Sequence, residues 1–255
     1  MEYGYKVKEI FCWNKRKKIY GAAYIPETEK GGRHPLVIFA HQLGATHAAG
    51  AEYAKKLAER GTAVYTFDFC GGGVDSKSDG VTTEMSILTE VEDLEAVLGA
   101  ARTWDFVDPG KIALLGASQG GVVSAITAAR RGDGIAGLIL LYPAFMIFDK
   151  VHAQFGAYER IPERFCFLDW IHVGRDYAAD IWDVDIYSEM EKYSGPVLLI
   201  HGGKDNIADI SYTQRAAQTF PDARLYVIGR AGHAFFGRSF RESVAYIDDF
   251  LKGLR

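Results

Sequence analysis

The stretch KIALLGASQGGVVSAITAARRGD, residues 111–133, decides how this chain folds. The apolar run IALLGA predicts a buried strand, and the run of small and apolar residues after Ser118 predicts a helix. Ser118 is therefore expected in the turn between them, within the pattern G-x-S-x-G. Such a turn requires residues without bulk two positions before and two after the serine, and Gly116 and Gly120 meet this requirement. The context favours a nucleophilic serine over an ordinary turn residue.

Two residues further along the chain could activate that hydroxyl. A serine attacks a carbonyl only if a base takes its proton. Asp205 comes shortly after the apolar run VLLIHGG, and His233 directly follows LYVIGRAG, so both are expected at the same edge of a sheet as Ser118. The order Ser, Asp, His is that of the α/β-hydrolases. Two alternatives stay open: Asp209 is a second candidate acid, and His233, before the apolar residues AFF, could be a packed structural imidazole.

Acyl transfer also needs two N–H donors for the oxyanion of its tetrahedral intermediate. The main-chain N–H of Gln119, directly after the serine, is expected to be one of them. The other should come from the loop that follows the strand-like run PLVIFAHQ, residues 35–42. Leu43 is the first candidate in this loop, and Gln42 is the second.

Eight short apolar runs alternate with longer amphipathic stretches, which is typical of a mostly parallel sheet with helices on both faces. The last six runs are almost continuously apolar, as expected for parallel strands that are covered on both faces. The first two alternate more and predict an antiparallel pair at an edge. The eight runs are residues 5–13, 17–25, 35–42, 62–70, 111–117, 136–144, 195–203 and 223–232.

One connection is much longer than the others. About fifty residues, 145–194, separate two runs that are expected to be neighbouring strands, and they are rich in aromatic and charged side chains. A connection of that length predicts an insertion with structure of its own, often a lid. The whole chain, residues 1–255, is thus expected to form one domain that carries this lid insertion.

The overall composition argues against several classes of protein. With 29 Lys and Arg against 33 Asp and Glu, the net charge is −4, so no nucleic-acid partner is expected. The three cysteines are widely spaced, which suits neither a disulfide framework nor a zinc site. No apolar stretch is long enough for a signal peptide or a membrane span. We therefore expect a cytoplasmic protein with no membrane partner, no metal and no other cofactor.

The chain resembles the α/β-hydrolase esterases in a series of motifs that covers nearly its whole length. These are PLVIFAHQLGATH (35–47), YTFDFCGGGVDSKSDG (65–80), LLGASQGG (114–121), LLIHGGKD (198–205) and AGHAF (231–235). The resemblance implies the α/β-hydrolase fold, a catalytic triad of Ser118, Asp205 and His233, and oxyanion donors from Leu43 and Gln119. Two motifs depart from the family, because residues 41–43 read HQL where HGF is usual, and residues 70–73 read CGGG in place of RGHG.

The insertion is similar to the lid of bacterial cinnamoyl, or feruloyl, esterases. The similarity lies in the stretch YERIPERFCFLDW, residues 158–170. It implies that the polar residues that bind the phenol group of a substrate correspond to Asp149, Gln154 and Tyr177. Trp170, at the end of the stretch, is a fourth candidate substrate contact, whereas most aromatics of the insertion are expected to pack within it.

The function that this resemblance implies is that of a serine carboxylesterase acting through an acyl-enzyme. Small carboxylic esters, among them hydroxycinnamate (feruloyl-type) esters, are the expected substrates. The expected partner is thus a small-molecule ester, and the exposed face of the insertion could also serve a homodimer. Two alternatives stay open: a single-domain serine peptidase of the prolyl-oligopeptidase type, and a non-catalytic receptor with a hydrolase fold. The presence of all three triad residues argues against the receptor.

Overall fold

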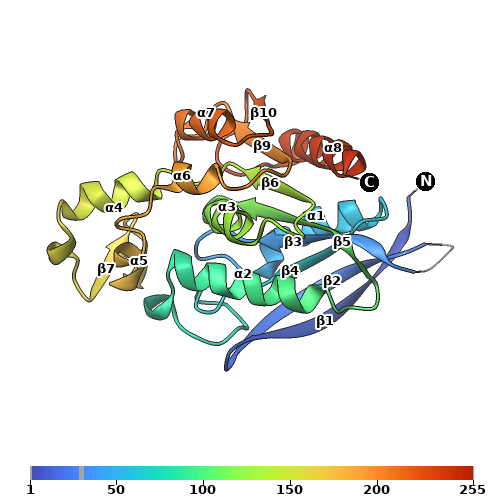
Figure 1. The fold of residues 1–255 in the computed structure, drawn as a ribbon, viewed down its shortest axis with the longest axis horizontal. Coiled ribbons are helices and arrows are strands. Elements are labelled where there is room, and N and C mark those ends of the chain that lie inside the picture. Colours follow the sequence, from blue (N-terminus) through green and yellow to red (C-terminus); the bar gives the residue numbers. More distant parts are fainter. Residues whose placement is uncertain (1, 29–31, 255) are drawn as a thin grey trace.

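A sheet of eight strands forms the middle layer of the computed structural model, which describes residues 2–28 and 32–254 (Figure 1). Its strand order is β1-β2-β4-β3-β5-β6-β9-β10. Strands β3, β4, β5, β6, β9 and β10 run parallel, whereas β1 pairs with β2 and β2 with β4 in antiparallel fashion. The predicted sheet and its antiparallel pair are thereby confirmed. The bounds are Gly4–Asn14 (β1), Lys17–Glu27 (β2), His34–Ala40 (β3), Ala63–Phe67 (β4), Val107–Ala117 (β5), Gly137–Leu141 (β6), Val197–Gly202 (β9) and Ala223–Ile228 (β10).

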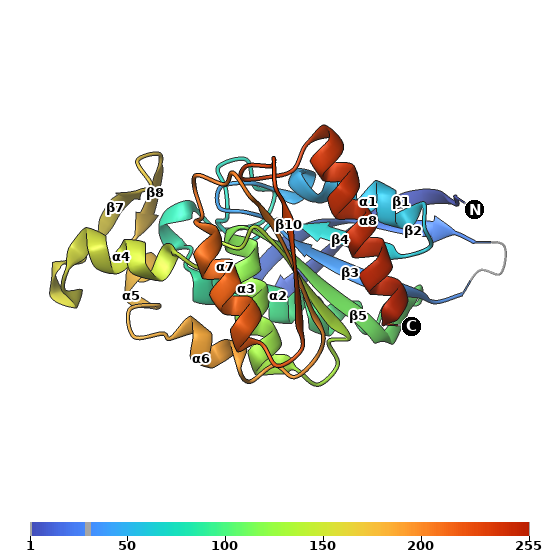
Figure 2. The same ribbon diagram turned by 90° about the horizontal axis from the view of Figure 1, so that it is seen from above.

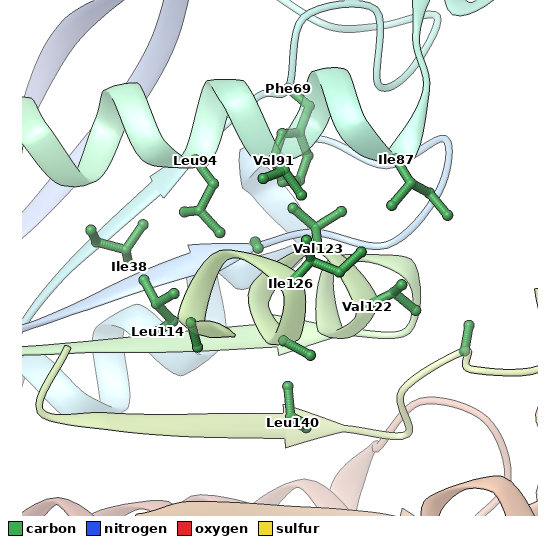
Figure 3. Close-up of a cluster of buried hydrophobic side chains, with 14 of the residues drawn as sticks. Ile38, Phe69, Ile87, Val91, Leu94, Leu114, Val122, Val123, Ile126 and Leu140 are labelled. Atoms are coloured by element: carbon green, nitrogen blue, oxygen red, sulfur yellow. The ribbon is translucent and has the colours of Figure 1, made fainter. Parts of the chain in front are cut away.

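Helices cover both faces of this sheet, which explains the nearly continuous apolar runs. Successive side chains of a strand point to opposite faces, and in β3 Leu36 and Ile38 join one buried cluster while Val37 and Phe39 join the other. Figure 3 shows the first cluster, where α2 and α3 pack on the sheet. The covering helices are α2 (Ile87–Ala101), α3 (Gln119–Arg131) and α7 (Ile210–Thr219) on that face, and α1 (Ala51–Ala58) and α8 (Gly237–Gly253) on the other. Within the residues that the structure describes, no helix is both long and apolar enough to cross a membrane.

The segment between β6 and β9, residues 142–196, forms a separate small layer, called the insertion segment below. Figures 1 and 2 show its residues 147–179 projecting beyond one end of the main sheet, whereas residues 186–190 lie against α3 and α7. It contains a two-stranded antiparallel sheet and short helices, so this long connection does carry structure of its own. Its predicted role as a lid stays a prediction. Its elements are α4 (Ile147–Phe155), β7 (Arg164–Phe167), β8 (Ile171–Gly174), α5 (Asp176–Ala179) and α6 (Ile186–Met190), and 3-10 turns lie at η1 (His47–Gly50), η2 (Thr82–Glu84) and η3 (Tyr158–Arg160).

The turn from β5 into α3 is as tight as its glycines suggest. Ser118 lies there with φ 52° and ψ −116°, a conformation that costs a residue with a side chain about 1–3 kcal/mol. A Cβ atom on Gly116 would lie 2.2 Å from the carbonyl oxygen of Gly120. A Cβ atom on Gly120 would lie 2.2 Å from the carbonyl oxygen of Ala40, at the end of β3. The requirement for residues without bulk at both positions is confirmed, and the turn is packed directly against the neighbouring strand.

We therefore predict opposite effects for two helical glycine-to-alanine substitutions. Gly120→Ala should lower the free energy of unfolding by about 1–3 kcal/mol or more, because its methyl group overlaps main-chain atoms that cannot move aside. Gly99→Ala should raise it by up to about 1 kcal/mol, because the added methyl group on α2 would meet no atom of another element within 4 Å and alanine favours the helix. Urea denaturation of both variants measures this. Equal effects of the same sign would contradict the steric account.

Candidate active site

Three side chains from separate strand ends meet at the carboxyl edge of the sheet. Ser118 follows β5, Asp205 follows β9, and His233 follows β10. His233 Nε2 lies 3.0 Å from Ser118 Oγ, and His233 Nδ1 lies 2.8 Å from Asp205 Oδ2. Asp209, the alternative acid, instead begins α7, where its carboxylate accepts a hydrogen bond from the Ser211 N–H. The structure thus brings together the three residues that the sequence singles out and leaves the fourth apart.

The Asp205 carboxylate is fully buried and accepts several hydrogen bonds. Its Oδ1 accepts from the main-chain N–H groups of Ile207 and Ala208, at 2.9 and 3.0 Å. Its Oδ2 faces His233 and also His201, whose Nε2 lies 3.2 Å away. Burial by itself raises the pKa of Asp205, but the hydrogen bonds from His201, His233 and the two amides together hold it well below its ordinary value. Asp205 is therefore an anion throughout the neutral range.

The loop after β3 lies against the turn at Ser118, since a Cβ atom on Gly120 would lie 2.5 Å from the His41 carbonyl oxygen. His41 Nδ1 lies 2.8 Å from the Gln42 carbonyl oxygen, which also accepts from the Ala45 N–H at 3.1 Å. The carbonyl and the following N–H of a trans peptide point in opposite directions. The Leu43 N–H is consequently turned away from the His41 ring, and it has no acceptor among the residues that the structure describes. The Gln119 N–H, at the first position of α3, likewise has no acceptor one turn earlier in the helix.

The tautomer of His41 follows from its two contacts. Its Nε2 accepts a hydrogen bond from the Phe69 N–H at 3.1 Å, so its Nδ1 carries the proton that is donated to Gln42. Burial of the ring lowers the pKa of His41 to about 4, and this outweighs the hydrogen bond to Gln42, which acts in the opposite direction. His41 is neutral at pH 7 and fixes the peptide between Gln42 and Leu43.

The four candidate substrate contacts do not lie in one place. Asp149 accepts a hydrogen bond from the Tyr212 hydroxyl at 2.6 Å, on the wall of a cavity of about 660 Å³ between α4, α6 and α7. Gln154 donates to the Cys166 carbonyl at 3.2 Å and lines a different cavity, beside Phe167. The structure therefore does not join Asp149 and Gln154 in a common pocket.

The other two candidates lie next to the groups just described. Trp170, 57% exposed, covers Gly44 in the loop after β3, where a Cβ atom on that glycine would lie 2.5 Å from the indole. Tyr177 is fully buried, and its hydroxyl donates to the Gln119 side-chain oxygen at 2.6 Å. Tyr177 thus contacts the residue that follows Ser118 rather than open space.

Two further side chains, which the sequence analysis does not single out, lie against His233 and Asp205. The Tyr142 ring lies edge-on against the His233 ring, with centroids 4.8 Å apart. His201 is buried between Asp205 and Thr213, whose Oγ1 lies 2.9 Å from His201 Nδ1. Tyr142 directly follows β6, and His201 lies near the end of β9, so both are at the carboxyl edge of the sheet, and that position is the signal by which they could have been found. In the described part of the chain, no group of three or more His, Cys, Asp or Glu side chains is placed to hold a metal ion.

Comparisons with known proteins agree with this architecture. An uncharacterised protein of Mycobacterium tuberculosis is 27% identical over 217 residues, which cover 82% of this chain and 65% of that protein. The chain therefore spans just under two thirds of that relative's length. Among solved structures, Est1E from Butyrivibrio proteoclasticus with ferulic acid bound superposes with a TM-score of 0.85 at 23% identity, covering 96% of this chain and 98% of that one. An esterase from Exiguobacterium antarcticum gives a TM-score of 0.73 at 19% identity, covering 96% of this chain and all of that one.

Two family models also match the chain. The model described as alpha/beta hydrolase fold matches residues 164–238, and the model described as serine aminopeptidase, S33, matches residues 32–175. At these identities the solved structures establish the fold. The model described as serine aminopeptidase, S33, establishes the family because it covers more than half of the chain. The protein has the predicted α/β-hydrolase fold and belongs to the hydrolase family described as serine aminopeptidase, S33.

Proposed function

We propose that this protein is a serine carboxylesterase that hydrolyses small carboxylic esters through an acyl-enzyme, with hydroxycinnamate esters among its substrates. The observation that carries the proposal is the continuous chain from Ser118 Oγ through the His233 ring to the buried Asp205 carboxylate. A hydroxyl, a base and an anion in this order are what nucleophilic catalysis by serine requires.

The chemistry follows from these contacts. His233 Nε2 takes the Ser118 proton as Oγ attacks the ester carbonyl, and later gives it to the departing alcohol. Asp205 holds the proton on Nδ1, so that Nε2 is free to accept, and it stabilises the imidazolium that forms. Its depressed pKa supports this role, because the carboxylate stays charged while the ring gains its proton. Water then repeats the sequence on the acyl-enzyme.

The oxyanion would be held by the N–H groups of Gln119 and Leu43. Neither N–H has an acceptor among the described residues, the first because it begins α3 and the second because of the peptide orientation that His41 fixes. Loss of one such donor typically costs about 10²–10³ in rate. In this proposal His41 takes no part in proton transfer; it positions the Leu43 peptide.

The hydroxycinnamate part of the proposal rests on the insertion segment. Its stretch 158–170 resembles the lids of feruloyl esterases, and Trp170 offers an exposed aromatic surface beside the loop after β3. The ferulic acid bound to Est1E, a protein of the same fold, is consistent with a planar aromatic acid as the acyl group. A peptidase is the second candidate, and the description of the matched family favours it.

Hydrolysis of three substrates by the wild type and two serine variants tests the proposal. Methyl ferulate and p-nitrophenyl acetate should both be cleaved, and an alanine p-nitroanilide should not. Ser118→Ala should lower kcat/KM by at least about a thousandfold, because the nucleophile is gone. Ser124→Ala is the matched control: its hydroxyl is buried in the same helix without a hydrogen-bond partner among the described residues, and its loss should leave the rates unchanged.

The outcomes separate the alternatives. Cleavage of p-nitrophenyl acetate without methyl ferulate would remove the hydroxycinnamate part and keep the esterase. Cleavage of the anilide alone would favour the peptidase. Equal rates for Ser118→Ala and the wild type would contradict the proposed nucleophile.

The pKa of His41 gives a second prediction, on stability. A histidine whose pKa falls on folding binds a proton more readily in the unfolded chain than in the folded protein. The free energy of unfolding therefore falls as the pH is lowered from the unfolded-state pKa, about 6.5, to the folded-state pKa. With a folded-state pKa of about 4 for His41, the loss between these values is about 3 kcal/mol. Urea denaturation at pH 7, 6, 5 and 4 should therefore show a steeper loss of stability for the wild type than for His41→Asn. Parallel pH profiles for the two proteins would contradict the buried neutral ring.

A further inference from the structure

A chain of three buried polar side chains links the insertion segment to the turn at Ser118. The Tyr177 hydroxyl, on α5, donates to Gln119 Oε1 at 2.6 Å, and Gln119 Nε2 donates to Glu90 Oε2, on α2, at 2.9 Å. None of the three side chains is more than 1% exposed. The Gln119 amide is thus held from both ends, by elements that lie far apart in the sequence.

Burial of polar side chains such as these costs free energy that apolar side chains in a core would not cost. Glu90 Oε1 has no hydrogen-bond partner among the residues that the structure describes. Burial, opposed only in part by the hydrogen bond from Gln119, raises the pKa of Glu90 to about 8, so the group is largely a neutral acid at pH 7. Apolar side chains of similar volume often stabilise such a site as well or better. The packing of α2 on α3 alone therefore does not explain why Glu90 stands here.

The place of Gln119 suggests what the chain does. Gln119 follows Ser118 directly, and its main-chain N–H is one of the two proposed oxyanion donors. The insertion segment also contacts the loop that carries the other donor, since Trp170 covers Gly44, the neighbour of Leu43. The insertion segment thus contacts the Gln119 side chain through Tyr177, and it contacts Gly44, the neighbour of Leu43, through Trp170.

We propose that Tyr177 and Glu90 are positioning residues that fix the Gln119 side chain and, with it, the main-chain N–H that stabilises the oxyanion. The insertion segment then supports the catalytic geometry as well as the shape of the acyl site. This inference rests on the proposed serine-hydrolase function. Neither residue touches the substrate; both act through Gln119.

The first test removes a single hydroxyl. In Tyr177→Phe the ring keeps its contact with Phe167, whose centroid lies 4.9 Å away, so the fold should be retained. With p-nitrophenyl acetate we expect kcat to fall about tenfold and KM to change by less than about twofold, because a misaligned donor is felt mainly in the transition state. The inhibition constant of a trifluoromethyl ketone, which forms an anionic adduct with serine, should rise by about the same factor as kcat/KM falls.

Tyr193→Phe is the matched control. Tyr193 is equally buried, and its hydroxyl donates to the Ile135 carbonyl at 3.2 Å, apart from the three-residue chain. This variant should leave kcat and the inhibition constant unchanged, whatever it does to the melting temperature. Loss of kcat in both variants to the same extent would mean that a general loss of packing is responsible, and would overturn the proposal.

Two substitutions of Glu90 extend the test. Glu90→Gln keeps the size and an oxygen acceptor for Gln119 Nε2, and should retain kcat within about twofold at pH 7. Glu90→Leu removes the acceptor and should lose about as much kcat as Tyr177→Phe. Because both act through Gln119, the double variant should lose less than the product of the two single losses. Full activity of Glu90→Leu and Tyr177→Phe, with only a lower melting temperature, would show that the chain is structural.

A readout that needs no turnover separates this inference from the proposed function. The ¹⁵N–¹H resonance of the Gln119 main chain should shift in Tyr177→Phe and stay in place in Tyr193→Phe, whether or not the protein cleaves an ester. An unchanged Gln119 resonance in Tyr177→Phe would overturn the inference. Absence of any ester hydrolysis by the wild type, with that resonance shifted, would overturn the proposed function alone.

Discussion

The structure depends most on the tight turn at Ser118. The chain leaves β5, passes through one residue with φ 52° and ψ −116°, and enters α3 at once. This is possible only because Gly116 and Gly120 allow main-chain atoms to approach as closely as they do. The strained turn places the serine side chain clear of the strand, beside the amino end of α3, whose first N–H has no acceptor within the helix. The other parts of the site are arranged around this fixed point.

Two buried groups at the site differ in charge: Asp205 is an anion and His41 is neutral. Asp205 is kept as an anion by four hydrogen-bond donors despite its burial, and His201 is one of them. His41 is kept neutral by burial, so it can both donate to Gln42 and accept from Phe69. The surroundings of Asp205 thus favour the charged carboxylate, and those of His41 favour the uncharged imidazole. Four donors outweigh the effect of burial at Asp205, whereas at His41 the one hydrogen bond that the ring donates, to Gln42, does not outweigh it.

Much of the fold, and the meeting of Ser118, Asp205 and His233, could be predicted because local patterns determine them. Six nearly continuous apolar runs are typical of strands covered on both faces, and the carboxyl ends of parallel strands meet at one edge. The insertion segment is different, since its short elements are stabilised by contacts with distant parts of the chain, as between Tyr177 and Gln119. The resemblance that singled out Asp149 and Gln154 gives no information on the distance between them, and the two line separate cavities. Glu90 stands on the apolar face of α2, between Ile87 and Leu94, and that position was the available signal of a buried acid.

The central claim is that the strained turn presents Ser118 as a nucleophile that His233 activates. The most direct measurement is labelling with a fluorophosphonate, followed by peptide mass mapping, in the wild type and in His233→Gln. The account predicts a single label, on the peptide that contains Ser118, and a rate of labelling at least about a hundredfold lower in the variant, because the base is lost. Labelling at another serine, or an equal rate in both proteins, would contradict it.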